Sequence, residues 1–154
     1  MKAAALALAL VFVPTLGLAQ VAVRPVPDVV SYATAFVSPA VAAVEAWRAP
    51  DRACRFSQLA MSEAFGNGLS LTLKHRIVSS RPCFGCAADG FPSGHTMNSA
   101  IGFSSHWQFG LTFALATAEL RVAANRHTPL QVAAGAAIGV FADGIGRALI
   151  RCER

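Results

Sequence analysis

Long apolar runs rich in alanine make up most of this chain, and none of them shows the apolar–polar alternation of a half-buried β-strand. Breaks containing Pro or Gly separate the runs. No internal repeat interrupts this organisation. Since helices accommodate such apolar runs and strands of this kind do not, we expect an all-α protein, a helical bundle of about five helices.

The breaks between the apolar runs place the expected helices. A kinked helix or two short ones should cover residues 29–47, and another should cover residues 55–72. Loop residues are expected over 74–91. Helix should resume at Ser93 or Gly94 and run to Trp107, and a further helix should extend from a break at 108–110 to about Asn125.

The last helix has the clearest start signal and should run to about Ile150. Thr128 is a good N-cap residue, Pro129 suits the first helical position, and Gln131 stands three residues after the cap, as in a capping box.

The length of 154 residues predicts one domain, over residues 20–154, after an N-terminal signal peptide over residues 1–19 or an uncleaved anchor in its place. Apolar residues make up 55% and charged residues 14%, which indicates a buried, all-helical or membrane-embedded protein. Segments 96–118 and 130–150 approach the length that spans a bilayer. Their alanines and glycines also suit a soluble bundle, and we expect membrane association.

Four cysteines suit a protein exported to an oxidising compartment. Their pairing does not follow from the sequence. A local bridge between Cys83 and Cys86 is favoured over a redox dithiol, and Cys54 with Cys152 is its natural companion. The net charge of +5 comes from scattered arginines without an interleaved aromatic stripe, so we expect no nucleic-acid partner.

Three short segments combine basic residues, histidines and a helix start. Lys74 lies seven residues before Arg81-Pro82, Pro92-Ser93-Gly94-His95 follows, and Arg121 lies six residues before His127. In this order they resemble the signature of the type 2 phosphatidic acid phosphatase (PAP2) and vanadium haloperoxidase superfamily, over roughly residues 74–135. The resemblance implies a core like that of this superfamily and a site for phosphate.

Phosphoryl transfer spreads negative charge over the non-bridging oxygens, so a site without metal needs cations and hydrogen-bond donors around them. Lys74, Arg81 and Arg121 can supply the charge. Ser93 and Gly94, where a loop becomes a helix, are expected to bind the phosphate with backbone N–H groups, and Ser93 either caps the helix or also donates its hydroxyl.

The resemblance implies that His127 attacks phosphorus and that His95 protonates the leaving oxygen and then activates water. The family usually carries Asp four residues after the nucleophile, and this chain has Gln131. Its side chain is expected to orient His127 or to complete the capping box with Thr128. Leu120 likewise stands where the family usually has Ser before the motif's Arg.

These residues predict a metal-independent phosphatase that needs no cofactor. We expect it in the cell envelope, in the periplasm or in the inner membrane with the site facing the periplasm. Its substrate would be a phosphorylated lipid, an isoprenoid diphosphate or a small phosphate ester. The alternatives are a degenerate member that binds anionic lipid and, less favoured, a vanadate-dependent haloperoxidase.

Overall fold

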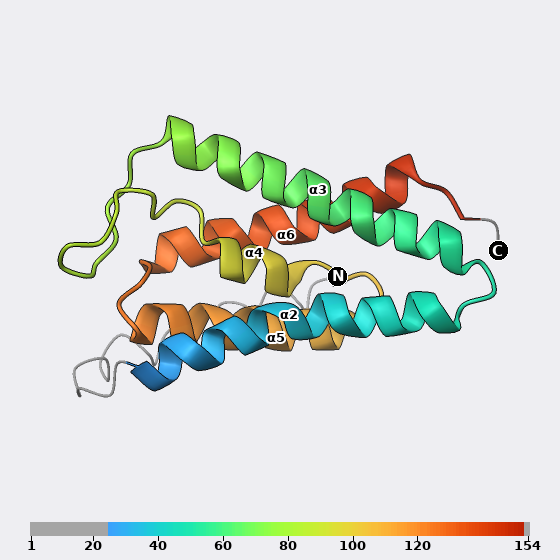
Figure 1. Cartoon of the computed structure of the whole chain (residues 1–154), viewed down its shortest axis with the longest axis horizontal. Helices are drawn as coiled ribbons and strands as arrows, with labels where there is room; N and C mark the ends of the chain where they lie inside the picture. Colours follow the sequence, from blue (N-terminus) through green and yellow to red (C-terminus); the bar gives the residue numbers. More distant parts are fainter. Residues whose placement is uncertain (1–24, 153–154) are drawn as a thin grey trace, which may run out of the picture.

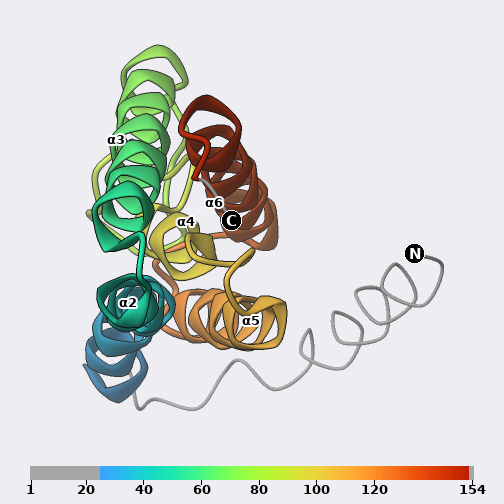
Figure 2. The same cartoon turned by 90° about the vertical axis from the view of Figure 1, so that its right-hand side faces the viewer.

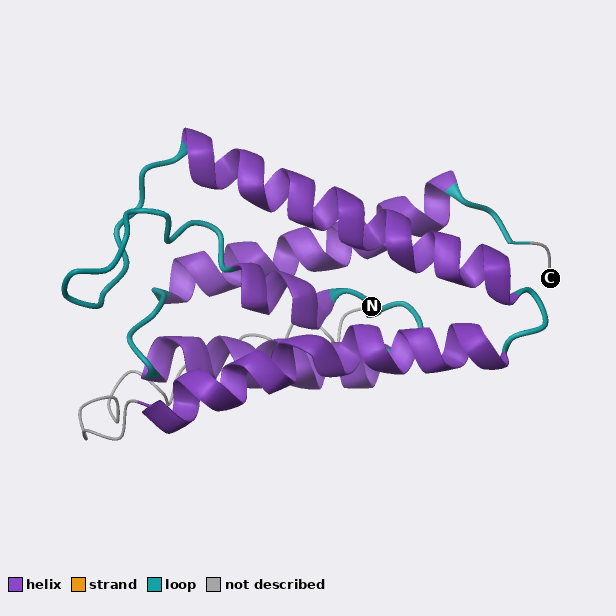
Figure 3. Cartoon of the chain, in the orientation of Figure 1, coloured by secondary structure: helices purple, strands orange, loops and turns teal. Residues whose placement is uncertain are grey.

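The computed structural model describes residues 25–152, which form five helices and no strand beyond one isolated bridge between Ser79 and Asp89. Figures 1 and 3 show the helices in order. They are α2 (Pro25–Arg48), α3 (Arg52–Arg76), α4 (Gly94–Ala100), α5 (Trp107–Ala123) and α6 (Pro129–Leu149). The expected all-α bundle is confirmed. The predicted signal peptide or anchor lies outside the described residues.

The four long helices form two layers around the short α4. Figure 2 shows α2 beside α5, α3 beside α6, and α4 between the layers, in contact with all four helices. Helices α2, α4 and α6 begin at the same end of the bundle, and α3 and α5 end there. The loop 77–93 lies at this end as well. All the predicted site residues belong to that end.

Small side chains fill the interior between the helices. Most of the buried apolar residues are alanines, and the buried polar residues are mainly serines and threonines. A Cβ atom at Gly139 of α6 would collide with the carbonyl oxygen of Met97 in α4. Glycine at this position therefore allows α6 to approach the backbone of α4 closely.

Several predicted helix boundaries are wrong. The break expected at 108–110 lies inside α5, because that helix begins at Trp107. α3 continues through Lys74 to Arg76, so Lys74 lies on a helix and not in the loop. Helix α4 ends at Ala100, well before Trp107, and segment 96–118 is therefore not one continuous helix. The break occurs at Gly102, where φ is +87°, and the Asp143 carboxylate of α6 accepts the N–H groups of Gly102 and Ser104 at 3.1 and 2.9 Å.

The start predicted for the last helix is confirmed in detail, because Thr128 and Gln131 form the full capping box. Both expected disulfides are present. Cys54 pairs with Cys152 at one end of the bundle, and Cys83 pairs with Cys86 in the loop at the other end. By length and composition, α2 over Val26–Arg48 and α6 are apolar enough to cross a membrane.

Candidate active site

The fold brings the predicted basic residues and histidines together at one end of the bundle. The positive charges of Arg121, Arg81 and Lys74 all act on the imidazole of His95, and those of Arg121 and Arg81 act on His127. These residues come from α3, the loop 77–93, α4, α5 and the segment before α6. The close grouping arises from tertiary packing of segments up to about fifty residues apart.

His127 is buried and its ring orientation is defined by two acceptors. Its Nδ1 lies 2.9 Å from the carbonyl oxygen of Gly90 and 3.2 Å from Oε1 of Gln131. A carbonyl oxygen can only accept, so Nδ1 must carry the ring proton. The lone pair of the neutral imidazole is therefore on Nε2, which makes no hydrogen bond within the described residues.

Gln131 serves both of the roles that its sequence position suggested. Its Oε1 accepts the Thr128 N–H at 3.0 Å and also faces His127 Nδ1. Its Nε2 donates to Ser79 Oγ and to the Ser80 carbonyl, both at 2.9 Å. Because the Ser80 carbonyl accepts only, this contact determines the orientation of the amide. One side chain thus links the helix start, the imidazole and the loop.

Gly90 has a role that sequence reasoning missed, since the pair Asp89-Gly90 indicated only a turn. Its carbonyl accepts from His127, and its N–H donates to the Ser79 carbonyl at 2.7 Å. A Cβ atom here would lie 2.5 Å from Gln131 Nε2 and 2.8 Å from the Ser79 carbonyl. Only glycine fits between these groups without displacing them.

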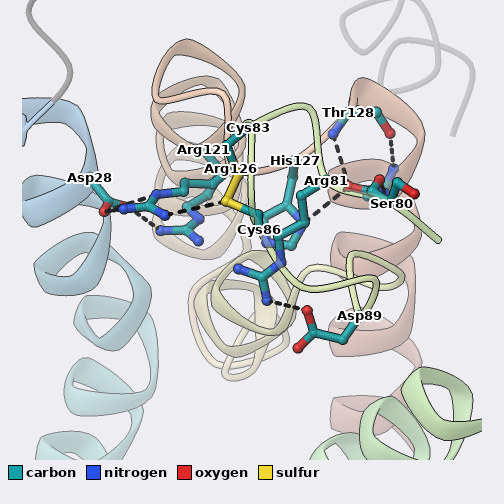
Figure 4. Close-up of a disulfide and its surroundings, with 11 residues drawn as sticks. Asp28, Ser80, Arg81, Cys83, Cys86, Asp89, Arg121, Arg126, His127 and Thr128 are labelled. Carbon is teal, nitrogen blue, oxygen red and sulfur yellow. Dashed lines mark hydrogen bonds and ion pairs between the residues drawn. A yellow bond between two sulfur atoms is a disulfide. The ribbon is translucent and has the colours of Figure 1, made fainter. Parts of the chain in front are cut away.

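Arg121 is almost fully buried, and an unpredicted carboxylate holds it. Its Nη1 donates to Asp28 Oδ1 of α2 at 2.6 Å (Figure 4). The same Nη1 also donates to Ser31 Oγ at 3.2 Å. The other oxygen of Asp28 accepts from Arg126 at 2.7 and 3.1 Å. No sequence motif pointed to Asp28, because its partners lie more than ninety residues away.

Asp89, another residue that the motifs did not indicate, contacts both Lys74 and Arg81. Lys74 Nζ donates to the Asp89 carbonyl at 2.8 Å, and Arg81 Nη2 lies 3.0 Å from its carboxylate, as Figure 4 shows for the arginine. Burial lowers the pKa of Lys74, and the nearby positive charges of Arg81 and Arg121 act in the same direction while Asp89 opposes them. The loop and the end of α3 are thereby joined.

Two guanidinium donors remain unpaired in this cluster. The Nε–H groups of Arg81 and Arg121 are buried and have no hydrogen-bond partner within residues 25–152. Buried donors of this kind are rare in folded proteins because they have lost their hydration without a replacement. A bound anion would supply that replacement.

Ser93 is confirmed as the N-cap of α4, with its hydroxyl 3.1 Å from Thr96 Oγ1 and 3.5 Å from the Thr96 nitrogen. It is fully buried, and its own N–H donates to the Gln131 carbonyl at 2.9 Å. The next residue, Gly94, faces open space, since a Cβ atom there would meet nothing within 4 Å. The structure thus shows the capping role of Ser93, and its backbone N–H, which was expected to bind phosphate, is instead donated to the Gln131 carbonyl.

His95 lies on the first turn of α4 against Tyr32 of α2, a contact that the sequence did not suggest. The ring centroids are 4.3 Å apart and the rings nearly perpendicular. Burial, together with the charges of Arg121, Arg81 and Lys74, lowers the pKa of His95 to about 4, while Asp28 acts in the opposite direction. His95 is therefore neutral near pH 7 in the free protein.

Burial also lowers the pKa of His127 to about 4, with the charges of Arg121 and Arg81 acting in the same direction. Its hydrogen bonds to Gln131 and Gly90 oppose this change. A neutral imidazole with a free Nε2 is the protonation state that a nucleophile requires.

The charge balance distinguishes this end of the bundle from a cavity of about 210 Å³ at the other end. Beside the cavity, Arg55 pairs with Asp51 and Arg147 with Asp143, and Glu45 adds a further negative charge. Around His127, the cations outnumber the carboxylates by four to two. They are Lys74, Arg81, Arg121 and Arg126 against Asp28 and Asp89. The His127 end is thus the one that favours an anion.

No protein-family model, curated protein or solved structure matches the chain. Within the described residues, no three His, Cys, Asp or Glu side chains cluster in a way that could hold a metal ion. The functional assignment therefore depends on the residues of the site and their geometry.

Proposed function

We propose that this protein is a metal-independent phosphatase of the PAP2 and vanadium haloperoxidase type, with His127 as its nucleophile. The observation that carries the proposal is the state of the His127 ring. Its Nδ1 proton is donated to the Gly90 carbonyl and Gln131, so the lone pair of the ring is on Nε2. The positive charges of Arg81 and Arg121 act on this ring, and the Nε–H groups of both arginines are unpaired. A neutral nucleophile among fixed cations suits attack on a phosphate group.

The proposed reaction assigns one chemical role to each of these groups. Nε2 of His127 forms a bond to phosphorus as the bond to the leaving alcohol oxygen breaks. The alcohol oxygen takes a proton from His95. His95 then removes a proton from water, whose oxygen attacks phosphorus, so that the P–N bond breaks and inorganic phosphate leaves. Arg81, Arg121 and Lys74 stabilise the charge on the non-bridging oxygens.

His95 must be protonated to act as the acid, although its pKa is low in the free protein. The negative charge of a bound phosphate favours the imidazolium form and raises this pKa. Substrate binding therefore favours protonation of His95, the general acid. The excess of cations at this end of the bundle balances the negative charge of the bound phosphate.

Phosphate esters of lipids, isoprenoid diphosphates and small soluble phosphate esters are the substrate classes that we propose. The paired cysteines at both ends of the bundle fit an oxidising compartment. This supports a place in the cell envelope, on the periplasmic side of the inner membrane, where lipid phosphates are accessible.

The test is release of phosphate from phosphatidic acid and from p-nitrophenyl phosphate by the purified protein in the presence of a chelator. His127→Ala should abolish release, while His75→Ala, which removes an exposed histidine at the end of α3, should leave it unchanged. Trapping with labelled substrate should give an acid-labile phosphohistidine in the wild type only.

Equal release by the wild type and His127→Ala would exclude His127 as the nucleophile. A wild-type protein that binds phosphate but never turns over would instead support the degenerate, anion-binding alternative.

A further inference from the structure

The distribution of apolar side chains is inverted relative to that of an ordinary soluble bundle. None of the nine phenylalanines and two tryptophans among the described residues is buried. The interior holds mainly alanine, glycine and serine, and its largest fully buried side chains are Met97, Ile101 and Val132. Small residues between helices and large apolar residues outside are typical of proteins that contact lipid.

Helix α2 carries more of this exposed apolar surface than any other helix in residues 25–152. Seven of its large apolar residues are exposed, against four on α6 and two each on α3 and α5. The seven on α2 are Val26, Val29, Val30, Tyr32, Phe36, Val44 and Trp47. Together with exposed alanines they form what we call the α2 face.

The α2 face is broad and uncharged. At 100° per residue, its exposed positions from Val26 to Trp47 cover roughly 160° of the helix circumference. No charged residue occurs between Val29 and Val44. A seam against one partner helix is narrower and is normally flanked by charges, so the α2 face suits a lipid phase better than a second copy of the chain.

Basic residues stand at the far end of the α2 face. Arg48 and Arg52 are both exposed, and the Arg52 guanidinium lies 5.6 Å from the centre of the Trp47 ring. Tryptophan beside arginine is well suited to the boundary between apolar lipid chains and anionic headgroups. In the sequence, the apolar run expected to be a signal peptide or anchor precedes the other end of α2.

The two disulfides restrict how the bundle can be oriented relative to a membrane. Cys54–Cys152 and Cys83–Cys86 lie at opposite ends of the bundle's long axis, as the ends of α3 in Figure 1 show. If the bundle spanned the bilayer, one pair would face the reducing cytoplasm. Contact along the side of the bundle keeps both pairs in one oxidising compartment.

We propose that the α2 face docks this protein on a bilayer that contains anionic lipids, with α2 lying along the membrane plane. The apolar side chains enter the boundary of the acyl chains, and Arg48 and Arg52 bind headgroup phosphates. The docked orientation brings the site to the membrane, because Asp28 and Tyr32 on the first turns of α2 contact Arg121 and His95. Use of lipid-borne phosphate at that site rests on the proposed phosphatase activity.

The test is flotation of the purified protein with vesicles of phosphatidylethanolamine and phosphatidylglycerol. Phe36→Ser should lower the partition coefficient roughly tenfold, because burying a Phe side chain in an apolar phase raises the partition coefficient by at least about a factor of ten. Phe141→Ser is the matched control, since Phe36 and Phe141 are both 56% exposed but Phe141 lies on α6. Arg48→Glu with Arg52→Glu should weaken binding to these vesicles and leave binding to pure phosphatidylcholine unchanged.

Circular dichroism and urea unfolding of each variant separate a docking defect from a folding defect. The proposal is overturned if the wild type does not float, or if Phe36→Ser and Phe141→Ser reduce flotation equally. It is also overturned if Phe36→Ser converts a dimer to a monomer without changing flotation, since a second copy would then cover the α2 face. Turnover of soluble p-nitrophenyl phosphate reports separately on the phosphatase, and Phe36→Ser should retain it.

Discussion

The carbonyl oxygen of Gly90 lies 2.9 Å from Nδ1 of His127, closer than the side chain of Gln131 at 3.2 Å. A backbone carbonyl thus supplies the orienting acceptor for the imidazole, and Gln131 is the second acceptor. This arrangement explains how the ring proton can be placed on Nδ1 in a chain that lacks the Asp expected from the resemblance. It brings no negative charge, so the imidazolium form receives less stabilisation here than a carboxylate would give.

Gly90→Ala should reduce phosphatase turnover about 100-fold, because the new Cβ displaces the Gln131 amide or the Ser79 carbonyl and moves the acceptor of His127. Steady-state kinetics on p-nitrophenyl phosphate measures this. The control is Gly144→Ala on α6, where a Cβ meets nothing within 4 Å and turnover should be retained. Similar rates for both variants would contradict a role for the Gly90 carbonyl.

Gln131→Asp should destabilise the fold by about 1–2 kcal/mol and should not raise turnover. Aspartate cannot donate to Ser79 Oγ or to the Ser80 carbonyl, and each lost hydrogen bond contributes about 1 kcal/mol. Urea unfolding measures the change, with Gln108→Asp at an exposed position as the control. A large gain in turnover would show instead that the missing carboxylate limits the wild type.

Asp28→Asn should lower the free energy of unfolding by about 3 kcal/mol, since it leaves the nearly buried Arg121 without its counter-ion. The matched control is Asp51→Asn, which removes the partner of the more exposed Arg55 and should change stability by less than about 1 kcal/mol. Equal effects in chemical denaturation would mean that Asp28 is not the anchor of Arg121.

Stability should fall as the pH drops from above 6.5 towards 4. The pKa of His127 is about 4 in the folded protein against an ordinary value of 6.5, so within this window the unfolded chain binds more protons. The contribution lost is on the order of 3 kcal/mol for this buried group. Urea titrations across the range should show a weaker pH dependence for His127→Gln, and exposed His75→Gln should behave like the wild type.

The sequence predicted correctly those structural features that depend on contacts between residues close together in the chain. The capping box at Thr128 and Gln131 starts α6 as expected, because its hydrogen bonds join residues three apart. The end of α4 was mispredicted, because the helix stops where the distant Asp143 accepts the N–H groups of Gly102 and Ser104. Hydrophobic periodicity contains no information about such a contact.

The same division applies to the candidate site. The spacing of Lys74, Arg81, His95, Arg121 and His127 was enough to nominate these residues, since a motif records which residue types occur in order. The sequence by itself also determined the all-α class, through apolar runs that suit helices and not half-buried strands. Tertiary structure alone decided that Gly90 orients His127, that Asp28 holds Arg121 and that Tyr32 packs on His95. The physical reason is that these contacts join residues 37 to 93 positions apart in the sequence, and only tertiary packing brings such residues into contact.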